Sequence, residues 1–409
     1  LIDWVEWGSE AFEEAHRQDK PVMLYLHAFW CGFCHRVDEG AFSSDENIAL
    51  VNAYFIPVRV ENGQRPDIDV RYNQNGWPTI AFMTPEGDHL VSVNYLAPEE
   101  FGNVLSKIHM NYREKRAEIK DAMEQAKEEA SRRAGSGGSQ DGITETSIAD
   151  IANNLMTLAD RVQGGFGPDH KFPHPEVLEF LIDRYEGTQD SSYLEHVILT
   201  LDRMREGEIH DRGGGFFRYS TNADWSHPHR EKLLVDQAGL LKVCLRVLSI
   251  SGRPVDKEMA EEFIDYLNTS LSDISGATFC GCQDYFRPPA KEGAEVPKEY
   301  IPVVDGWLYT DANAQAIDAY LKASKVLSRP DCRDRALNAL TFLWNRCRGR
   351  KGGMFHYYDG EPRVSGLLAD QIHMGLSLLE AYGLTQEKIY LDCAKDMAEF
   401  ILGSFKNPA

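Results

Sequence analysis

The stretch Trp30-Cys31-Gly32-Phe33-Cys34-His35 decides the fold expected for the first part of the chain. It follows an apolar run at residues 21–26 (Pro-Val-Met-Leu-Tyr-Leu) and precedes an amphipathic segment, an order that predicts strand, tight turn and helix. Cys31 then lies at the helix start, where unpaired N–H groups and the helix dipole favour a thiolate. Cys34 lies one turn further in, more buried, and can close a disulfide onto Cys31. The spacing therefore predicts a redox pair with Cys31 as its exposed member.

Two other interpretations of this pair stay open. A lone CxxC can be half of a zinc site, which needs a second pair or histidines at ligand spacing. The other closely spaced cysteines, Cys280 and Cys282, are far along the chain in a different kind of sequence. The pair can also be inert and buried. Cys280 and Cys282 could themselves form a second redox pair, but no helix-start signal accompanies them. The remaining four cysteines fall in predicted helices and are expected to be buried hydrophobes.

The composition is that of a soluble globular protein with material for two or three domains. The chain has 409 residues, 43% of them hydrophobic, and a net charge of -21. This charge argues against a nucleic-acid partner and against attraction to anionic membranes. No apolar run approaches the roughly 20 residues of a membrane span. No signal peptide is visible, but the sequence starts at Leu1 rather than Met, so both cytoplasmic and extracytoplasmic locations stay open.

Helical and extended patterns alternate over the first 110 residues. Helices are expected at residues 9–18, 32–42, 46–54 and from Pro98 on, and strands at residues 21–27, 55–60, 79–83 and 89–95. A polar loop with Gly63 and Pro66 separates the second and third strands. This order predicts a mixed sheet with helices on both faces.

The same region resembles the thioredoxin-like superfamily. Trp30-Cys31-x-x-Cys34 follows a strand, and Trp77-Pro78-Thr79 precedes one. The resemblance implies a cis peptide bond at Pro78, beside the disulfide, where an extended substrate segment would pair with the backbone. Trp30 and Trp77 would then support the cysteines. His35 follows the pair directly and is a candidate to bias the thiolate, with an ordinary surface histidine as the other interpretation. The position of the acidic residue found in many thioredoxins is Tyr25, which puts a buried carboxylate proton relay in doubt.

The second part of the chain has a different sequence pattern. The thioredoxin-like domain is expected at residues 1–112. Residues 113–142 are expected to be a charged helical spacer followed by a linker, which includes the Gly/Ser stretch at residues 134–139. Amphipathic stretches of helical period then recur at residues 143–162, 175–185, 191–205, 233–249, 257–270, 312–325, 332–347, 367–381 and 387–402.

Gly-aromatic loops connect these stretches, and two of them lead into matching helices. Gly214-Gly215 precedes Leu233-Leu234-Val235-Asp236-Gln237, and Gly352-Gly353 precedes Leu367-Leu368-Ala369-Asp370-Gln371. Repeated helix pairs with such connections predict an all-α (α/α) toroid at residues 143–409. The helices are fewer than a complete barrel needs, so either the ring is incomplete or the sequence is truncated after Ala409.

The chain also resembles the family of spermatogenesis-associated protein 20, a DUF255-like group with bacterial members. The resemblance lies in residues 164–173 (GGFGPDHKFP), 213–220 (GGGFFRYS) and 228–238 (PHREKLLVDQA). It implies a thioredoxin-like domain joined to an α/α barrel similar to N-acylglucosamine 2-epimerases and six-hairpin glycosidases. Gly32 and Phe33 depart from the family, which usually has His and Trp there.

A cavity in the toroid would suit a sugar, because aromatic side chains stack on it and carboxylates and imidazoles exchange protons. His229 is the leading acid or base candidate by position. The repeated Asp236-Gln237 and Asp370-Gln371 pairs are more simply explained as ties between loops and helix starts, and Glu231-Lys232 as a salt-bridged helix start. The candidate lining residues are Trp225, His227, His229, Glu231, Asp236, Tyr309, Asp311, His356 and Asp370.

The leading hypothesis is a thiol–disulfide oxidoreductase in which Cys31 and Cys34 react with a protein thiol or disulfide partner. The toroid would bind a partner or a carbohydrate-like ligand. Two alternatives stay open: a carbohydrate-active epimerase or hydrolase with an accessory thioredoxin-like domain, and a scaffold without catalysis. We expect no cofactor and no metal at either site.

Overall fold

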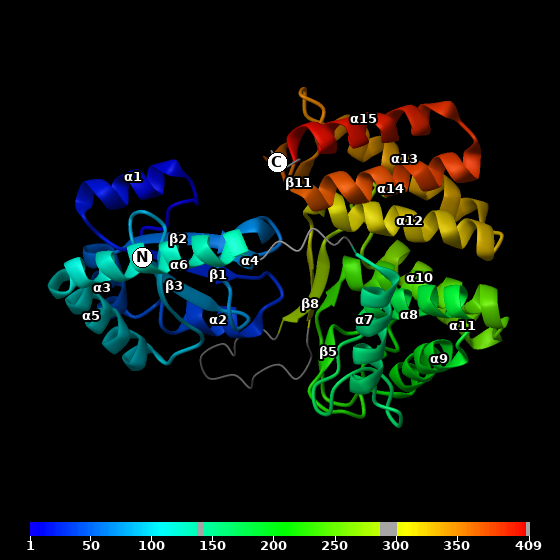
Figure 1. The fold of residues 1–409 in the computed structure, drawn as a ribbon, viewed down its shortest axis with the longest axis horizontal. Helices are drawn as coiled ribbons and strands as arrows, with labels where there is room; N and C mark the ends of the chain where they lie inside the picture. Colours follow the sequence, from blue (N-terminus) through cyan, green and yellow to red (C-terminus); the bar gives the residue numbers. More distant parts are fainter. Residues whose placement is uncertain (137–142, 287–300, 406–409) are drawn as a thin grey trace. The chain divides into compact units, whose positions relative to one another are not determined.

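The computed structural model describes residues 1–136, 143–286 and 301–405 (Figure 1). The chain separates into two compact units, Leu1–Gly142 and Ile143–Ala409, each with cores built from its own residues. Residues 134–136 of the expected Gly/Ser linker form the end of a helix, and the rest of that stretch lies outside the described residues. Among the described ranges, no helix combines the length and apolar character needed to cross a bilayer.

The first unit is built on a mixed sheet of four strands. They are β1 (Val22–His27), β2 (Ile56–Glu61), β3 (Thr79–Met83) and β4 (His89–Val93). The strand order is β2-β1-β3-β4, in which β1 is parallel to β2 and antiparallel to β3, and β4 is antiparallel to β3. The expected strands and the mixed sheet are therefore confirmed.

Successive side chains of β1 point to opposite faces of the sheet, and each face has its own core. Met23 and Tyr25 pack with residues of α2 (Gly32–Glu39), α3 (Asp45–Tyr54) and α5 (Pro98–Glu114). Leu24 and Leu26 pack with residues of α1 (Ser9–Gln18) and α4 (Pro66–Tyr72). Helices thus cover both faces, as the apolar runs of the strands predict.

Two details of the first unit differ from the sequence prediction. A polar loop was expected around Pro66, but Pro66 is the first residue of the helix α4. The missing N–H of proline is harmless at this position, because the first N–H groups of a helix have no intrahelical partner. The side chains of Ile68 and Tyr72 are buried and attach this helix to the core. The long helix after Pro98 breaks at Lys115 and continues as α6 (Arg116–Ser136). This expected spacer also pairs with the first unit, through Arg116 with Asp19 and Lys127 with Asp88.

The second unit contains nine helices in its described residues, at the nine expected places. They are α7 (Glu145–Leu158), α8 (Pro175–Thr188), α9 (Ser191–Glu206), α10 (Leu234–Ser251), α11 (Pro254–Thr269), α12 (Thr310–Val326), α13 (Pro330–Arg346), α14 (Leu368–Thr385) and α15 (Lys388–Ser404). Prolines at the first position of α8, α11 and α13 set the starts of these helices.

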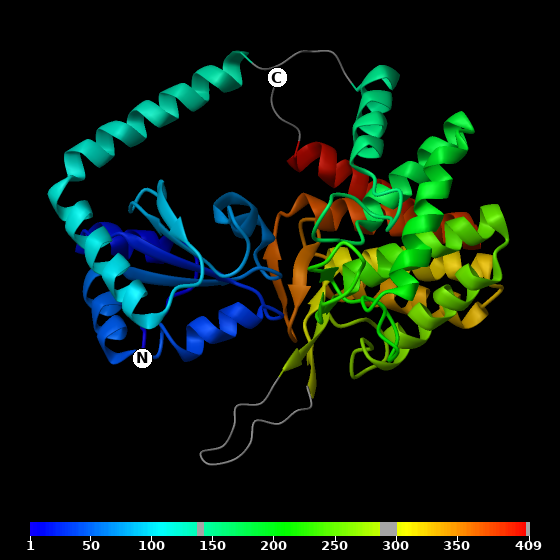
Figure 2. The same cartoon turned by 90° about the horizontal axis from the view of Figure 1, so that it is seen from below.

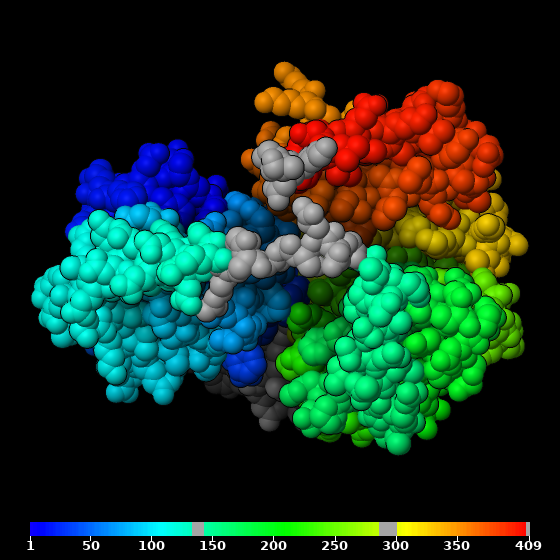
Figure 3. Space-filling model, viewed as in Figure 1, coloured from blue at the N-terminus to red at the C-terminus, as the bar shows by residue number. Residues whose placement is uncertain are grey.

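The helices form a double layer of hairpins (Figures 1 and 2). Helices α8, α10, α12 and α14 pack side by side in that order, and each packs against the helix that follows it in the chain. Figure 3 shows α14 and α15 at the surface of this unit. Leu368, Ile372 and Leu376 are exposed at four-residue spacing on α14, so the described residues leave one side of this helix uncovered.

Short strands occupy the connections between the hairpins, where no strands were expected from the sequence. They are β5 (Tyr219–Ser220), β6 (Pro228–His229), β7 (Lys232–Leu233), β8 (Cys282–Phe286), β9 (Ile301–Asp305), β10 (Leu308–Tyr309), β11 (Phe355–Tyr358) and β12 (Pro362–Ser365). They pair as β5-β6, β7-β8-β9 and β10-β11-β12, next to the N-terminal ends of α10, α12 and α14. Most are too short to leave a period-two pattern in the sequence.

Candidate functional sites

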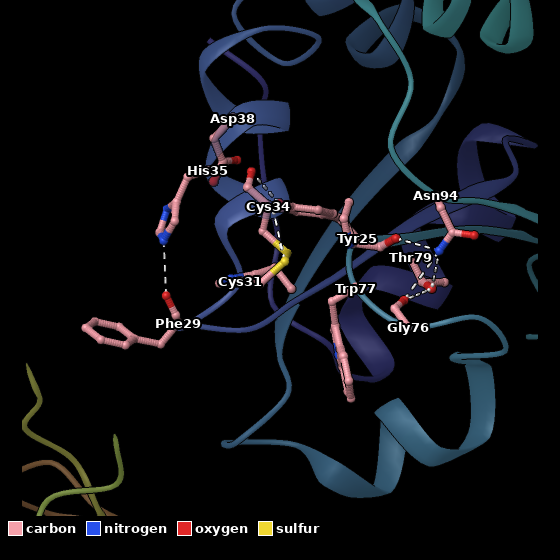
Figure 4. Close-up of a disulfide and its surroundings, with 12 residues drawn as sticks. Tyr25, Phe29, Cys31, Cys34, His35, Asp38, Gly76, Trp77, Thr79 and Asn94 are labelled. Carbon is pink, nitrogen blue, oxygen red and sulfur yellow. Dashed lines mark hydrogen bonds between the residues drawn. A yellow bond between two sulfur atoms is a disulfide. The ribbon is translucent and has the colours of Figure 1, made fainter. Parts of the chain in front are cut away.

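Cys31 and Cys34 form a disulfide at the start of α2 (Figure 4). Cys31 is the N-cap residue, and the backbone N–H of Cys34 donates to its Sγ at 3.1 Å. Cys31 is 6% exposed and Cys34 1%. The pairing and the more buried second cysteine agree with the sequence prediction, whereas the exposed first cysteine is not found.

A tyrosine fills the place beneath the disulfide. The buried Tyr25 hydroxyl donates to the carbonyl oxygen of Cys34 at 3.2 Å. Burial raises the pKa of Tyr25 well above its ordinary value. Nearby, Arg59 pairs with Asp38 (2.9 Å) and donates to Nε2 of His27 (3.1 Å). Burial, aided by Arg59, lowers the pKa of His27 to about 3, so its ring is neutral.

The ring of His35 is held by a hydrogen bond to the backbone. Its Nε2 donates to the carbonyl oxygen of Phe29 at 3.1 Å, and Figure 4 shows the ring turned toward Phe29. This contact anchors the loop that leads into Cys31. His35 therefore lies where the sequence placed it, but its visible role is to hold the loop.

The Trp77–Pro78 peptide bond is cis, as the resemblance implied. Three hydrogen bonds hold the loop that contains this peptide bond. The Trp77 indole N–H donates to Asp69 (2.8 Å), the Asn94 amide donates to the carbonyl oxygen of Pro78 (2.9 Å), and the Thr79 hydroxyl donates to that of Gly76 (2.6 Å). The polar partners Asp69 and Asn94 were missed as site residues, although each stands at the end of a predicted element or loop.

Aromatic side chains surround the disulfide. The Trp30 and Trp77 rings meet edge to face at 5.0 Å between centroids, and the rings of Phe33 and Tyr95 meet similarly at 5.6 Å. Phe33 and Tyr95 are exposed. The four rings give the surface next to Cys31 an apolar character that suits a polypeptide segment.

In the second unit, amide side chains clamp the Gly-aromatic loops to the helix starts. Gln237 accepts from the backbone N–H of Phe216 (2.9 Å) and donates to its carbonyl oxygen (2.7 Å). Gln371 does the same with Met354 (2.7 and 3.0 Å). The loop-tying role expected for the two glutamines is therefore present. A third clamp, Asn313 on Phe279 (2.9 Å for both bonds), escaped the sequence analysis because its surroundings lack the Leu-Leu-x-Asp-Gln pattern.

Two of the expected lining residues have other roles. Trp225 is completely buried in the core, with its indole N–H donating to the carbonyl oxygen of Gln163 (2.7 Å). His227 is exposed in a loop, where its backbone N–H donates to Glu208 (2.8 Å). The expected Glu231-Lys232 pair is also wrong, because Lys232 and Glu231 point to different partners. Lys232 is buried against Asp211 (2.5 Å) and the carbonyl oxygen of Gly214 (2.6 Å).

His229, Glu231 and Asp236 form a first group around Arg218. Glu231 is buried, with Arg218 at 3.8 Å and His229 at 4.0 Å. The His229 ring stacks on Tyr219 at 4.3 Å. Burial raises the pKa of Glu231 to about 7 and that of Asp236 to about 6, and it lowers the pKa of His229. The carboxyl groups of Glu231 and Asp236 can therefore exchange protons near neutral pH.

Tyr309, Asp311, His356 and Asp370 form a second group. Nδ1 of His356 donates to the Asp370 carboxylate at 2.9 Å, and both residues are buried. The backbone N–H of Asp311 donates to the same carboxylate at 3.2 Å. The Tyr309 ring lies 5.7 Å from that of His356, and its hydroxyl donates to Asp305 (2.8 Å). Burial raises the pKa of Asp370, and His356 opposes this shift.

The other six cysteines form no disulfide. Five are buried, among them Cys280 and Cys282, and Cys393 is half-buried. Burial raises the pKa of Cys280 to about 11, which disfavours the reactive thiolate. A second redox pair at Cys280 and Cys282 thus has no support in this structure.

The chain is similar in sequence to a known protein family and to several known relatives. Residues 1–131 match the family model Thioredox_DsbH, described as a protein of unknown function, DUF255. Human spermatogenesis-associated protein 20 is 32% identical over 322 residues, which cover 73% of this chain and 40% of that protein. The expected family resemblance is confirmed. The thiol:disulfide interchange protein DsbD of Yersinia pestis is 32% identical over 81 residues, 19% of this chain and 14% of that protein.

The second unit has the fold of known α/α toroids. A cellobiose 2-epimerase from Bacillus thermoamylovorans superposes with a TM-score of 0.50 at 12% identity, covering 64% of this chain and 73% of that one. A sugar epimerase from a ruminal bacterium gives 0.51 at 12% identity, covering 63% and 70%. The chain is thus a thioredoxin-like domain followed by a helical toroid. It spans about two fifths of the length of the spermatogenesis-associated relatives that it matches.

Proposed function

We propose that the protein is a thiol–disulfide oxidoreductase that works through Cys31 and Cys34. The observation that carries this proposal is the disulfide at the start of α2, with the backbone N–H of Cys34 directed at Cys31 Sγ. In the reduced protein this N–H and the helix N-terminus stabilise a thiolate on Cys31. The interchange activity in the name of the similar DsbD protein is in keeping with this chemistry.

The reaction is an exchange of two electrons with a protein partner. The Cys31 thiolate attacks a substrate disulfide, forms a mixed disulfide and releases one substrate thiolate. Cys34 loses its proton and attacks Cys31 Sγ, which closes the Cys31–Cys34 bond and releases the second thiolate. The substrate ends reduced and the protein oxidised; with an oxidised protein and a dithiol substrate, the same steps run in reverse.

The experiment is a trapping assay on the full chain. A Cys34→Ser variant keeps the attacking sulfur but cannot resolve the mixed disulfide, so it should accumulate covalent adducts with a disulfide-containing protein such as insulin. The Cys31→Ser variant should form none. Cys280→Ser is the matched control and should reduce insulin like the parent. If Cys31→Ser reduces insulin at the parent rate, the proposal is wrong.

The first group in the toroid favours a second function, binding or conversion of a carbohydrate-like ligand. Glu231 and Asp236 offer acid and base groups near neutral pH at and just before the start of α10, and His229 lies beside Glu231. The superposed structures are named as sugar epimerases, and for this chain we propose only the ligand class. Binding of cellobiose or mannose that is lost in Glu231→Gln but kept in Cys31→Ser would support this function. No binding of any neutral sugar would contradict it.

A further inference from the structure

We propose that Asp311, His356 and Asp370 bind a divalent transition-metal ion of the zinc class. They come from three separate elements: Asp311 from the first turn of α12, His356 from β11 and Asp370 from the first turn of α14. One carboxylate oxygen from each aspartate and one ring nitrogen of His356 lie within 4.8 Å of one another. This proposal is independent of the redox proposal, which concerns the other unit.

The spacing of the donor atoms suits one small ion. Ligand atoms bound to zinc at about 2 Å lie about 3–4 Å apart, so small side-chain rotations bring these three into place. Imidazole and carboxylate donors without thiolate select zinc, manganese and cobalt over softer ions. Asp311 is half-buried whereas His356 and Asp370 are buried, which leaves the Asp311 side open for water or a further ligand.

The charge balance of the site differs from that of the neighbouring repeat. The clamps by Gln237 and Gln371 align Phe216 with Met354, and therefore Arg218 with His356 and Asp236 with Asp370. In the first repeat Arg218 is a permanent cation, and it opposes the burial that raises the pKa of Asp236. In the other repeat His356 takes the place of this arginine, and it lies beside two aspartates, Asp370 and Asp311.

The repeat between them has no side chain at the position of Arg218 and His356. Its clamp by Asn313 on Phe279 places Gly281 at the position of Arg218 and His356. A Cβ atom at Gly281 would lie 2.4 Å from the Tyr309 ring, so no side chain fits there. Asp311, two residues before Asn313 in the helix of this repeat, lies beside Asp370 and His356. A bound divalent cation would neutralise the two carboxylates.

Contacts around the cluster hold its members in place. Gln371 clamps Met354, two residues before His356, and the Thr310 hydroxyl donates to the carbonyl oxygen of Phe355 (2.6 Å). Both residues that neighbour His356 on its N-terminal side are therefore fixed to the helices that carry the aspartates. Such support is what metal sites use to orient their ligands.

The test is metal titration of the full-length, disulfide-bonded protein after treatment with a chelator and its removal. Zinc followed by calorimetry should bind at one site per chain. Cobalt should give visible d–d absorption without a thiolate-to-cobalt charge-transfer band. Asp311→Asn and His356→Gln should each weaken zinc binding by at least about 10-fold. Asp236→Asn, the aligned aspartate opposite Arg218, is the matched control and should bind like the parent.

Three outcomes would overturn the proposal: no saturable one-to-one binding, binding unchanged in both variants, or a cobalt spectrum with thiolate bands. If His356→Gln fails to fold, Asp311→Asn still decides, because this half-buried carboxylate is the most replaceable ligand. Histidine-labelled NMR gives a second readout, since zinc at a concentration that half-saturates the parent should shift the His356 resonances of the parent clearly and those of Asp311→Asn much less.

Discussion

The Tyr25 hydroxyl occupies the place where a proton-relaying carboxylate would serve Cys34. It donates to the carbonyl oxygen of Cys34, and its raised pKa keeps it protonated over the physiological range. Tyr25 thus supports the disulfide helix and does not act as a base. The proton that Cys34 releases during exchange must leave by another route.

This role can be tested with Tyr25→Phe. The variant should be less stable by about 1 kcal/mol, because one buried hydrogen bond is lost while the ring stays. Its rate of insulin reduction should stay close to that of the parent, measured alongside urea unfolding. Tyr54→Phe, at an exposed tyrosine, serves as the control and should change neither quantity. A large loss of rate in Tyr25→Phe without loss of stability would show that the hydroxyl takes part in proton transfer.

Glu231 makes the stability of the second unit depend on pH. Its pKa is about 7 in the folded protein because of burial, against an ordinary value of 4.5. The folded state holds this proton more tightly than the unfolded state, so stability is lost as pH rises from about 4.5 to about 7. Glu231→Gln cannot lose a proton and should be more stable than the parent by up to about 3 kcal/mol at pH 8, and equal to it near pH 4.

Unfolding by urea at a series of pH values measures this difference. Glu195→Gln, at an exposed carboxylate, is the control and should follow the parent at every pH. Parallel curves for the parent and Glu231→Gln would show that Glu231 has an ordinary pKa.

At the level of single residues, the reactive cysteines were easier to predict from the sequence than the residues that hold the site in place. The CxxC spacing was enough to expect the Cys31–Cys34 disulfide, because a helix start brings these two positions together. The partners of Pro78 and Trp77, Asn94 and Asp69, come from other elements and have no local signal. Trp225 was expected to line a cavity but is buried in the core, because the residue type alone does not distinguish these two environments.

Secondary-structure elements were easier to predict than their junctions. The nine helices of the second unit follow from their apolar periodicity and from prolines at their starts. The clamps were visible only where the pattern repeats, at Gln237 and Gln371. Asn313 makes the same two bonds with a shorter side chain, so geometry repeats there while the sequence pattern does not.

The clamps should contribute strongly to stability. Gln371→Ala removes the side chain that bonds the buried N–H and carbonyl oxygen of Met354, which should destabilise the second unit by about 3 kcal/mol. Calorimetric unfolding measures the loss. Gln125→Ala, at an exposed glutamine of α6, is the control and should be neutral. A loss of less than about 1 kcal/mol in Gln371→Ala would mean that water replaces the clamp.

On the scale of the whole molecule, the two units have separate cores. Phe82 belongs to a core of the first unit and Phe263 to that of the second, and both are buried. We therefore expect two unfolding transitions. Phe82→Ala should lower one of them by about 4 kcal/mol and Phe263→Ala the other by a similar amount. Scanning calorimetry of the full chain measures both, and a shift of both transitions by either variant would contradict independent units.

The sequence predicted the order and class of the two units because each has its own periodicity, alternating patterns first and helical patterns afterwards. It could not predict how far the ring of hairpins extends. The exposed Leu368, Ile372 and Leu376 of α14 show the reason, since their spacing is that of any amphipathic helix and does not reveal whether a neighbour covers them.

The amide clamps grip main-chain atoms, so they do not read the side chains of the loops that they hold. At one aligned position the three clamped loops carry arginine, glycine and histidine. Mutation can therefore change the side chain at this aligned position of each loop while the amide clamp itself stays unaltered. A ring built in this way is free to evolve new chemistry one loop at a time.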